Sequence, residues 1–241
     1  MGFFPIGDDN SLRVTTPYVV YGLLLANAIM WFVQLSLGES FTGGYATVPF
    51  EIMNGVDLTG IQRVDIGGKE FAIREYPGPS PIYVTLLSSM FMHGSWMHIL
   101  GNLLYLVIFA DQIEDLLGHG RFLLFYLLCG LAAGFAQILW DPSSIIPCLG
   151  ASGAIAGCLG AYLVRHPTNA VRVLIFRDII NVPAFIVLGG WIALQVFSQI
   201  GSSASKASGV AYLAHIGGFA AGVVLVFVLA IGRRRRDQDE R

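Results

Sequence analysis

The sequence predicts an all-α membrane protein, a bundle of six transmembrane helices with a long first loop. Hydrophobic residues make up 55% of the 241 residues and charged residues only 12%, about half the charged share of soluble domains. The apolar residues also gather into long stretches. A helix that crosses a bilayer needs about 20 mostly apolar residues, because the hydrocarbon core is ~30 Å thick.

Six stretches reach this length, and we expect the spans near residues 17–38, 93–113, 121–140, 146–165, 179–200 and 210–231. The first stretch is full length and lacks the pattern of a signal peptide, so we expect it to remain in the mature protein. The chain then divides into a short cytoplasmic segment (1–16), one helical domain (17–231) and a basic, then acidic, cytoplasmic tail (232–241).

The long first loop covers residues 39–92. Within it, "SPIYVTLLSSMF" begins at a proline and is too short to cross the membrane, so we expect an interfacial helix or a partly buried segment. Loops of this length in compact proteins are usually functional or packed on the surface.

The distribution of basic residues predicts the orientation. Six spans place both termini on one side, which then holds ten Lys and Arg residues against four on the other. The ten are Arg13, Arg121, Arg165, Arg172, Arg177, Arg233, Arg234, Arg235, Arg236 and Arg241, and the four are Arg63, Lys69, Arg74 and Lys206. Because basic loops stay in the cytoplasm, both termini are predicted to be cytoplasmic.

The composition also limits the partners. A net charge of −2, with no phosphate loop and no zinc-finger spacing, argues against nucleic acid, and the lipid bilayer is the expected surrounding. The run of four arginines is interpreted as an anchor after the last span. Cys129, Cys148 and Cys158 are an odd number, and we expect small buried residues and a free thiol at Cys148.

Polar residues inside spans are expensive in lipid and are therefore functional candidates. The second span carries "HGSWMHILGN", the fourth carries Ser152 and the sixth carries "AHIGGFAAG". All three spans enter from the outer face in the predicted orientation. Ser152, His215 and Asn102 lie about six, five and nine residues into them, or roughly 7 to 14 Å deep at ~1.5 Å per residue. These groups can share one layer.

Helical spacing separates the histidines. His98 and Asn102 are four residues apart and face the same way, whereas His93 and His98 are five apart and do not. This spacing argues against a two-histidine metal site, and no HExxH sequence occurs. His98 can also be a buried histidine that bridges two helices. Three glutamines lie in or near spans, and we expect them to form interhelical hydrogen bonds or to lie at the interface rather than to take part in chemistry: Gln34, Gln137 and Gln195.

Small residues make close helix contact possible. The fourth span carries Gly150, Gly153, Gly157 and Gly160, and the sixth carries Gly217, Gly218 and Gly222, at spacings that favour close backbone contact. Such contact lets the Ser152 hydroxyl reach His215, and histidine is suited to take a serine proton near neutral pH. Neither span contains Asp or Glu, so the pair is a dyad without a carboxylate.

These motifs resemble those of the rhomboid intramembrane serine proteases. The matching pieces are "HGSWMHILGN", "GASG" and "AHIGGFAAG", in that order on spans two, four and six. The resemblance implies that Ser152 is the nucleophile and His215 the general base. It implies an oxyanion hole formed by His98, Asn102 and the Ser152 backbone N–H, with His93, Gly150, Gly153 and Gly218 in supporting roles.

The implied activity is hydrolysis of peptide bonds within or next to transmembrane segments of membrane proteins, with no metal or cofactor. The implied location is a multi-pass position in the bacterial plasma (inner) membrane, with substrates that are transmembrane-helix proteins. Some family members hold the histidine with an aromatic residue four positions after the serine. Here that position is Ala156, and Tyr162 and Tyr212 are candidates instead.

Two other classes remain open. A non-proteolytic rhomboid-like protein would bind transmembrane helices as a chaperone or adaptor, although inactive relatives usually lack the serine or the histidine. A transporter or channel would need polar groups that continue into the cytoplasmic half, where these spans turn apolar ("LLYLVIF", "CLGAYLV", "VVLVFVLA").

Overall fold

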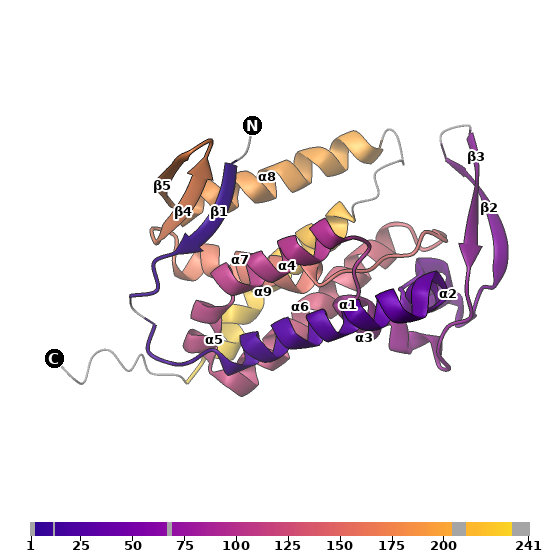
Figure 1. Cartoon of the computed structure of the whole chain (residues 1–241), viewed down its shortest axis with the longest axis horizontal. Coiled ribbons are helices and arrows are strands. Elements are labelled where there is room, and N and C mark those ends of the chain that lie inside the picture. Colours follow the sequence, from indigo (N-terminus) through magenta and orange to yellow (C-terminus); the bar gives the residue numbers. More distant parts are fainter. Residues whose placement is uncertain (1–2, 12, 67–68, 204–210, 233–241) are drawn as a thin grey trace.

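The computed structural model describes residues 3–11, 13–66, 69–203 and 211–232 (Figure 1). It is a bundle of apolar helices with a small three-stranded sheet at one end and a two-stranded hairpin at the opposite end (Figure 1). The predicted basic run 233–236, together with Lys206 and Arg241, lies outside the described residues.

Four described helices are long and apolar enough to cross a membrane. They are α1 (Tyr18–Tyr45), α6 (His119–Trp140), α8 (Ala184–Ser203) and α9 (Tyr212–Ala230). A fifth span is possible if α4 (Trp96–Phe109) and α5 (Asp111–Leu117), which meet at a bend of 45°, are taken together. Helix α7 (Ser152–Arg165) has only 14 residues. The multi-helix membrane fold is therefore present, and the count of six stays a prediction.

Several expected spans have different bounds in the structure. The stretch 93–113 becomes helical only at Trp96, where the Ser95 hydroxyl caps the helix by accepting from the His98 backbone N–H at 3.2 Å. The stretch 146–165 becomes helical only at Ser152, because the residues before it pair with another segment. In the first span, α1 continues to Tyr45 across a kink at Gly38, whose φ is 77°.

The predicted start of the span at 179–200 is wrong, because residues 178–183 form a strand and the helix begins at Ala184. Strand β5 (Asp178–Pro183) pairs antiparallel with β4 (Ala170–Ile175), and β4 pairs with β1 (Phe3–Asp8) from the amino terminus. Sequence analysis missed this sheet, since an apolar run of this length fits a strand as well as part of a helix. The amino-terminal segment is thus part of the fold.

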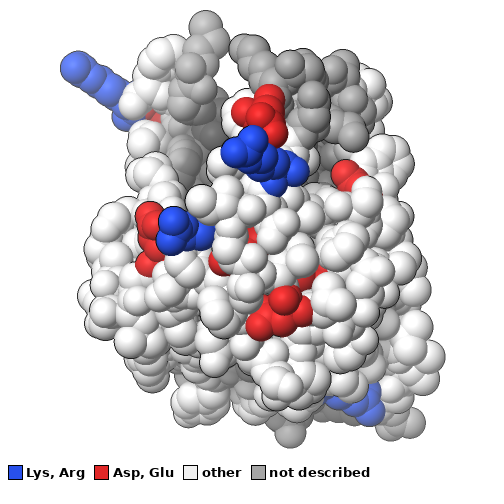
Figure 2. Space-filling view, turned by 90° about the vertical axis from the view of Figure 1, so that its right-hand side faces the viewer, with Lys and Arg blue, Asp and Glu red and all other residues white. Residues whose placement is uncertain are grey.

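The first loop carries structure of its own. Residues 39–92 contain the end of α1, helix α2 (Pro49–Asn54), and the hairpin of β2 (Gly60–Ile66) and β3 (Lys69–Glu75). The expected short segment is helical over Ile82–Phe91, as η1 (Ile82–Val84), α3 (Thr85–Ser88) and η2 (Ser89–Phe91). Figure 2 shows this end of the molecule, where charged side chains are scattered over a mostly uncharged surface.

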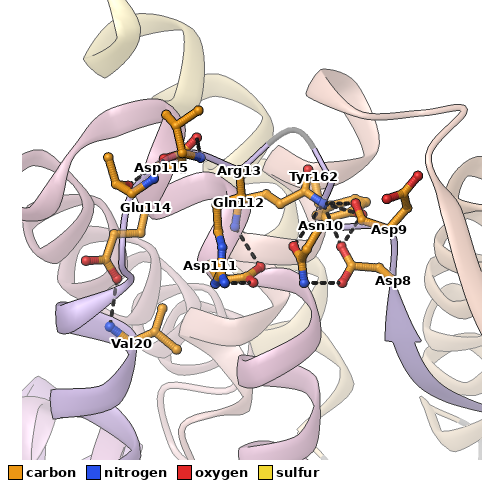
Figure 3. Close-up of polar contacts among 12 residues, drawn as sticks. Asp8, Asp9, Asn10, Arg13, Val20, Asp111, Gln112, Glu114, Asp115 and Tyr162 are labelled. Carbon is orange, nitrogen blue, oxygen red and sulfur yellow. Dashed lines mark hydrogen bonds and ion pairs between the residues drawn. The ribbon is translucent and has the colours of Figure 1, made fainter.

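A polar network fixes the amino terminus to the helices (Figure 3). The Asp8 carboxylate accepts from the Tyr162 hydroxyl and from the Gln112 amide, both at 2.7 Å. Arg13 pairs with Asp111 at 2.9 Å. Strand β1 and the start of α1 are therefore held against α5 and α7.

Apolar side chains fill the centre of the bundle. The largest fully buried ones come mainly from α4, α5, α6 and α7, and include Phe109, Ile113, Phe122, Phe125, Tyr126 and Leu159. Helix α7 lies among α6, α8 and α9, so the residues at its start are surrounded by other helices.

Candidate active site

Ser152 is the first residue of α7 and follows a turn that requires a glycine. Gly150 has a φ of 136°, and a Cβ atom built on it would lie 2.9 Å from Nε2 of His98. A residue with a side chain would meet both a backbone penalty and a clash there. The glycine thus lets His98 approach the backbone just before the serine.

Backbone contacts from the first loop hold this turn. The Gly150 N–H donates to the Ser89 carbonyl at 2.9 Å, and Thr47 and Cys148 exchange two backbone hydrogen bonds of 2.9 and 2.8 Å. The hydroxyls of Thr47 and Ser89 are also 2.8 Å apart. The first loop therefore supports the segment that presents Ser152, a role that the sequence did not reveal. All three cysteines are free, and Cys129 and Cys158 are buried, as expected.

His215 comes from α9, and its Nε2 atom lies 2.8 Å from the Ser152 Oγ atom. Glycines allow this approach. A Cβ atom on Gly218 would lie 2.0 Å from the Gly153 carbonyl oxygen, and one on Gly222 would lie 1.9 Å from the Gly157 carbonyl oxygen. The backbones of α7 and α9 are in direct contact, as the small-residue pattern predicts.

His98 and Asn102 line the same cavity as Ser152 and His215, a space of about 930 Å³. The Gly94 N–H points at Nδ1 of His98, at 3.4 Å. A neutral imidazole that accepts at Nδ1 carries its proton on Nε2. The ring edge formed by Cε1 and Nε2 is the part of His98 that a Cβ atom on Gly150 would meet. This assignment makes His98 a donor on the serine side.

The Asn102 amide is buried but has a free donor. Its side chain is part of a residue only 8% exposed, and within the described ranges nothing accepts a hydrogen bond from Nδ2. Buried polar atoms are nearly always paired in folded proteins. An unpaired donor beside a cavity is available to a ligand.

His93 lies next to His98 and is buried. Its backbone N–H donates to Gln34 at 2.9 Å, and its carbonyl accepts from the same amide at 3.0 Å, so α1 holds the segment before α4. The rings of His93 and His98 meet edge to face, with centroids 5.2 Å apart. The interhelical bond expected for Gln34 is replaced by two hydrogen bonds to the backbone of His93, in the non-helical segment before α4.

The second nitrogen of His215 faces Gln195 of α8. The Nδ1 atom lies 2.8 Å from the Gln195 Oε1 atom, and the Trp191 ring lies beside the imidazole, with centroids 5.8 Å apart. The interhelical hydrogen bond expected for Gln195 is thus present, and its partner is His215.

The two tyrosines considered for orienting His215 do not bond it in the described residues. Tyr162 was the wrong candidate, because its hydroxyl bonds Asp8 in the network of Figure 3. Ala156 lines the cavity, and no hydrogen bond joins Tyr212 to His215 among the described residues. Sequence position alone gave no reason to choose Gln195, since α8 has no matching motif.

The arrangement brings a hydroxyl, a basic nitrogen and several donors to one cavity. The first N–H groups of a helix have no partner within the helix, so the Ser152 N–H at the start of α7 is a further donor. The positive end of the helix dipole favours negative charge at the same point. Such a site can activate a hydroxyl and stabilise an oxyanion.

A bundle of several long apolar helices defines an integral, multi-pass membrane protein. A family model described as "Rhomboid domain" matches residues 81–232, which is more than half of the chain. The chain therefore belongs to the rhomboid family.

Named relatives include proteins of a plant and of a bacterium. The chain is 28% identical to RHOMBOID-like protein 4 of Arabidopsis thaliana over 188 residues, covering 78% of this chain and 40% of the relative. It is 29% identical over 153 residues to the putative rhomboid protease YdcA of Bacillus subtilis (63% of this chain, 69% of the relative). It is 39% identical over 84 residues to rhomboid protease GluP of the same species (35% and 16%). The match spans less than half the length of RHOMBOID-like protein 4 and of GluP.

Proposed function

We propose that the protein is an intramembrane serine endopeptidase that cleaves peptide bonds within or next to transmembrane segments of membrane proteins. The observation that carries this proposal is the 2.8 Å contact between Ser152 Oγ and His215 Nε2 beside a cavity. Two Bacillus subtilis relatives whose names include "rhomboid protease" support it.

In the proposed reaction, Ser152 is the nucleophile and His215 the general base. The Ser152 oxygen attacks the scissile carbonyl carbon while its proton moves to Nε2 of His215. The same proton then passes to the leaving amide nitrogen, and an acyl-enzyme remains. Water attacks this ester by the same route in reverse and releases the second product.

The oxyanion of each tetrahedral intermediate is proposed to lie against three donors. These are Nε2–H of His98, Nδ2–H of Asn102 and the backbone N–H of Ser152. The free donor of Asn102 supports this role, because an oxyanion would supply the missing acceptor. His93, Gly150, Gly153 and Gly218 are proposed to support the geometry.

The substrates are proposed to be proteins with transmembrane helices, because the cavity that Ser152 and His215 line belongs to a bundle of apolar, membrane-spanning helices. We also propose six spans, with α7 as the fourth, and both termini in the cytoplasm of a bacterium whose inner membrane holds the protein. Protease treatment of intact spheroplasts tests this: a tag at either terminus should be protected, and cleavage of the tag would overturn the orientation.

Labelling with a fluorophosphonate probe tests the activity itself. The detergent-solubilised protein should react at Ser152, as mapped by peptide mass spectrometry, and should cleave a model transmembrane substrate in proteoliposomes. Ser152→Ala should do neither. If the wild-type protein binds the substrate helix without labelling or cleavage, the alternative is correct, and the protein is a non-proteolytic rhomboid-like adaptor or chaperone.

A further inference from the structure

The ring of His215 is held from two sides by two other helices. Nε2 contacts Ser152 of α7 at 2.8 Å, and Nδ1 contacts the Gln195 carbonyl oxygen of α8 at 2.8 Å. Within the described part of the chain, these are the polar side chains hydrogen-bonded to the ring. Gln195 therefore occupies the place that a carboxylate takes in a Ser–His–Asp triad.

The carbonyl oxygen of Gln195 selects one tautomer of His215. A neutral imidazole has one N–H, and an oxygen acceptor beside Nδ1 requires that the proton is there. Nε2 is then left with its lone pair, which is the form that accepts the Ser152 proton. The other tautomer would present an N–H to the serine and could not act as a base.

The same contact bears on the charged form of the ring. When His215 takes the serine proton, both ring nitrogens become donors. The Gln195 oxygen can keep its hydrogen bond to Nδ1 throughout, so the ring need not turn. Because the amide is uncharged, its stabilisation of the imidazolium is weaker than that of a carboxylate.

Trp191 adds to the orientation from the same helix. It lies four residues before Gln195, so both side chains leave one face of α8. Its ring lies beside His215 at a centroid distance of 5.8 Å and beside Phe219 at 6.3 Å. Helix α8 thus places the Trp191 ring next to the imidazole of His215 and the Gln195 oxygen at its Nδ1 atom.

We propose that Gln195 is a positioning residue for His215. It is the third member of a hydrogen-bonded Ser–His–Gln set contributed by α7, α9 and α8. The proposal rests on the serine protease function proposed above. It accounts for the orientation of His215 in a chain that has Ala156 where some family members have an aromatic residue.

The test compares two substitutions of Gln195. Gln195→Met keeps the approximate length but offers Nδ1 only a weak sulfur acceptor, whereas Gln195→Glu keeps an oxygen acceptor and adds charge. Removing the tautomer-fixing carboxylate of a Ser–His–Asp triad costs about 10⁴ in kcat. For a neutral amide we expect a smaller loss, with kcat of Gln195→Met about 10- to 100-fold lower and KM within about twofold of wild type.

Gln195→Glu supplies a measurement, the pH profile of kcat/KM, that would not change if Gln195 only packed between helices. Gln195→Glu should recover most of the lost kcat, and the acidic limb of its kcat/KM profile should move to higher pH, because a negative charge favours the imidazolium. Val196→Ala is the matched control, since it changes the neighbouring, exposed residue of α8. It should leave kcat and the pH profile unchanged.

Nitrogen-15 NMR of histidine-labelled protein in detergent separates this proposal from the protease proposal. The His215 signal, assigned by loss in His215→Ala, should report Nδ1–H in the wild type and lose this tautomer in Gln195→Met, whether or not the protein cleaves a substrate. Wild-type kcat and tautomer in Gln195→Met would overturn the proposal. So would a loss of activity that follows the loss of folded protein and is not rescued in Gln195→Glu.

Discussion

Ser152 and Tyr162 lie near the two ends of one helix, α7, and the polar side chains around them differ in how fully they are hydrogen-bonded. The residues are ten positions apart, or ~15 Å along the helix axis. Around Tyr162, Asp8 accepts from Tyr162, Gln112 and Asn10, and Asp111 pairs with Arg13 (Figure 3).

Around Ser152, donors and acceptors are left over. In the described part of the chain, Asn102 Nδ2 and Gln137 Oε1 are buried without a partner, and both residues line the cavity. A fully bonded network holds elements together and has nothing to offer a ligand, whereas unpaired groups beside a cavity can bind one. The comparison predicts that substitutions near Tyr162 reduce stability and that those near Ser152 reduce activity.

The largest effect is expected at the Ser–His pair. Ser152→Ala and His215→Ala should each lower cleavage of a model transmembrane substrate by about 10⁴-fold or more, because each removes one half of the proton transfer. The thermal unfolding midpoint in detergent should stay close to that of the wild type. Undiminished turnover in either variant would remove the pair from the mechanism.

A smaller loss is expected at Asn102. Asn102→Ala removes one oxyanion donor and should lower kcat by about 10²- to 10³-fold. The Ser152 N–H and His98 remain as donors, so weak activity should persist, and KM should change little. Steady-state kinetics in proteoliposomes measure both constants. Wild-type kcat would mean that the free amide only packs between helices.

At the opposite end, Tyr162→Phe should affect stability rather than chemistry. It removes a donor to the buried Asp8 carboxylate, a loss of about 1 to 3 kcal/mol in the free energy of unfolding. The matched control is Tyr83→Phe, because Tyr83 is 52% exposed and should tolerate the change. A fall in kcat per folded molecule, measured at a temperature where both variants are folded, would contradict the division between the two ends.

A pH-dependent effect on stability is expected at Glu75 in the first loop. Burial, and secondly the nearby Glu51, raise the pKa of Glu75 from 4.5 to about 7. The folded state therefore holds this proton more tightly than the unfolded chain. Its stabilising contribution is full below pH 4.5, declines as the pH rises and is lost above about pH 7.

Unfolding midpoints measured from pH 5 to pH 8 test this effect. The wild type should lose stability as the pH rises, and Glu75→Gln should flatten that slope. Glu70→Gln, at a side chain 63% exposed on the same strand, should leave the slope as it is. An unchanged slope in Glu75→Gln would show that this carboxyl does not titrate as its burial indicates.

The sequence could predict those features that depend on local pattern. Long apolar runs identified the membrane helices α1, α6, α8 and α9, because span length follows directly from bilayer thickness. The order and depth of three polar motifs pointed to Ser152, His215, His98 and Asn102, which the structure brings to one cavity. The spacing of the glycines predicted the close backbone contact between α7 and α9.

Only the tertiary structure decided which distant residues meet. Three contacts join segments that no periodicity connects. They are the strand pairing of Phe3–Asp8 with Ala170–Ile175, the support of the Ser152 turn by Thr47 and Ser89, and the hydrogen bond that the Gln195 oxygen accepts from His215. An apolar run reports that a segment is buried but not what it is buried against. A glutamine in a span needs a partner, and hydropathy cannot name it, because the choice depends on how the helices pack.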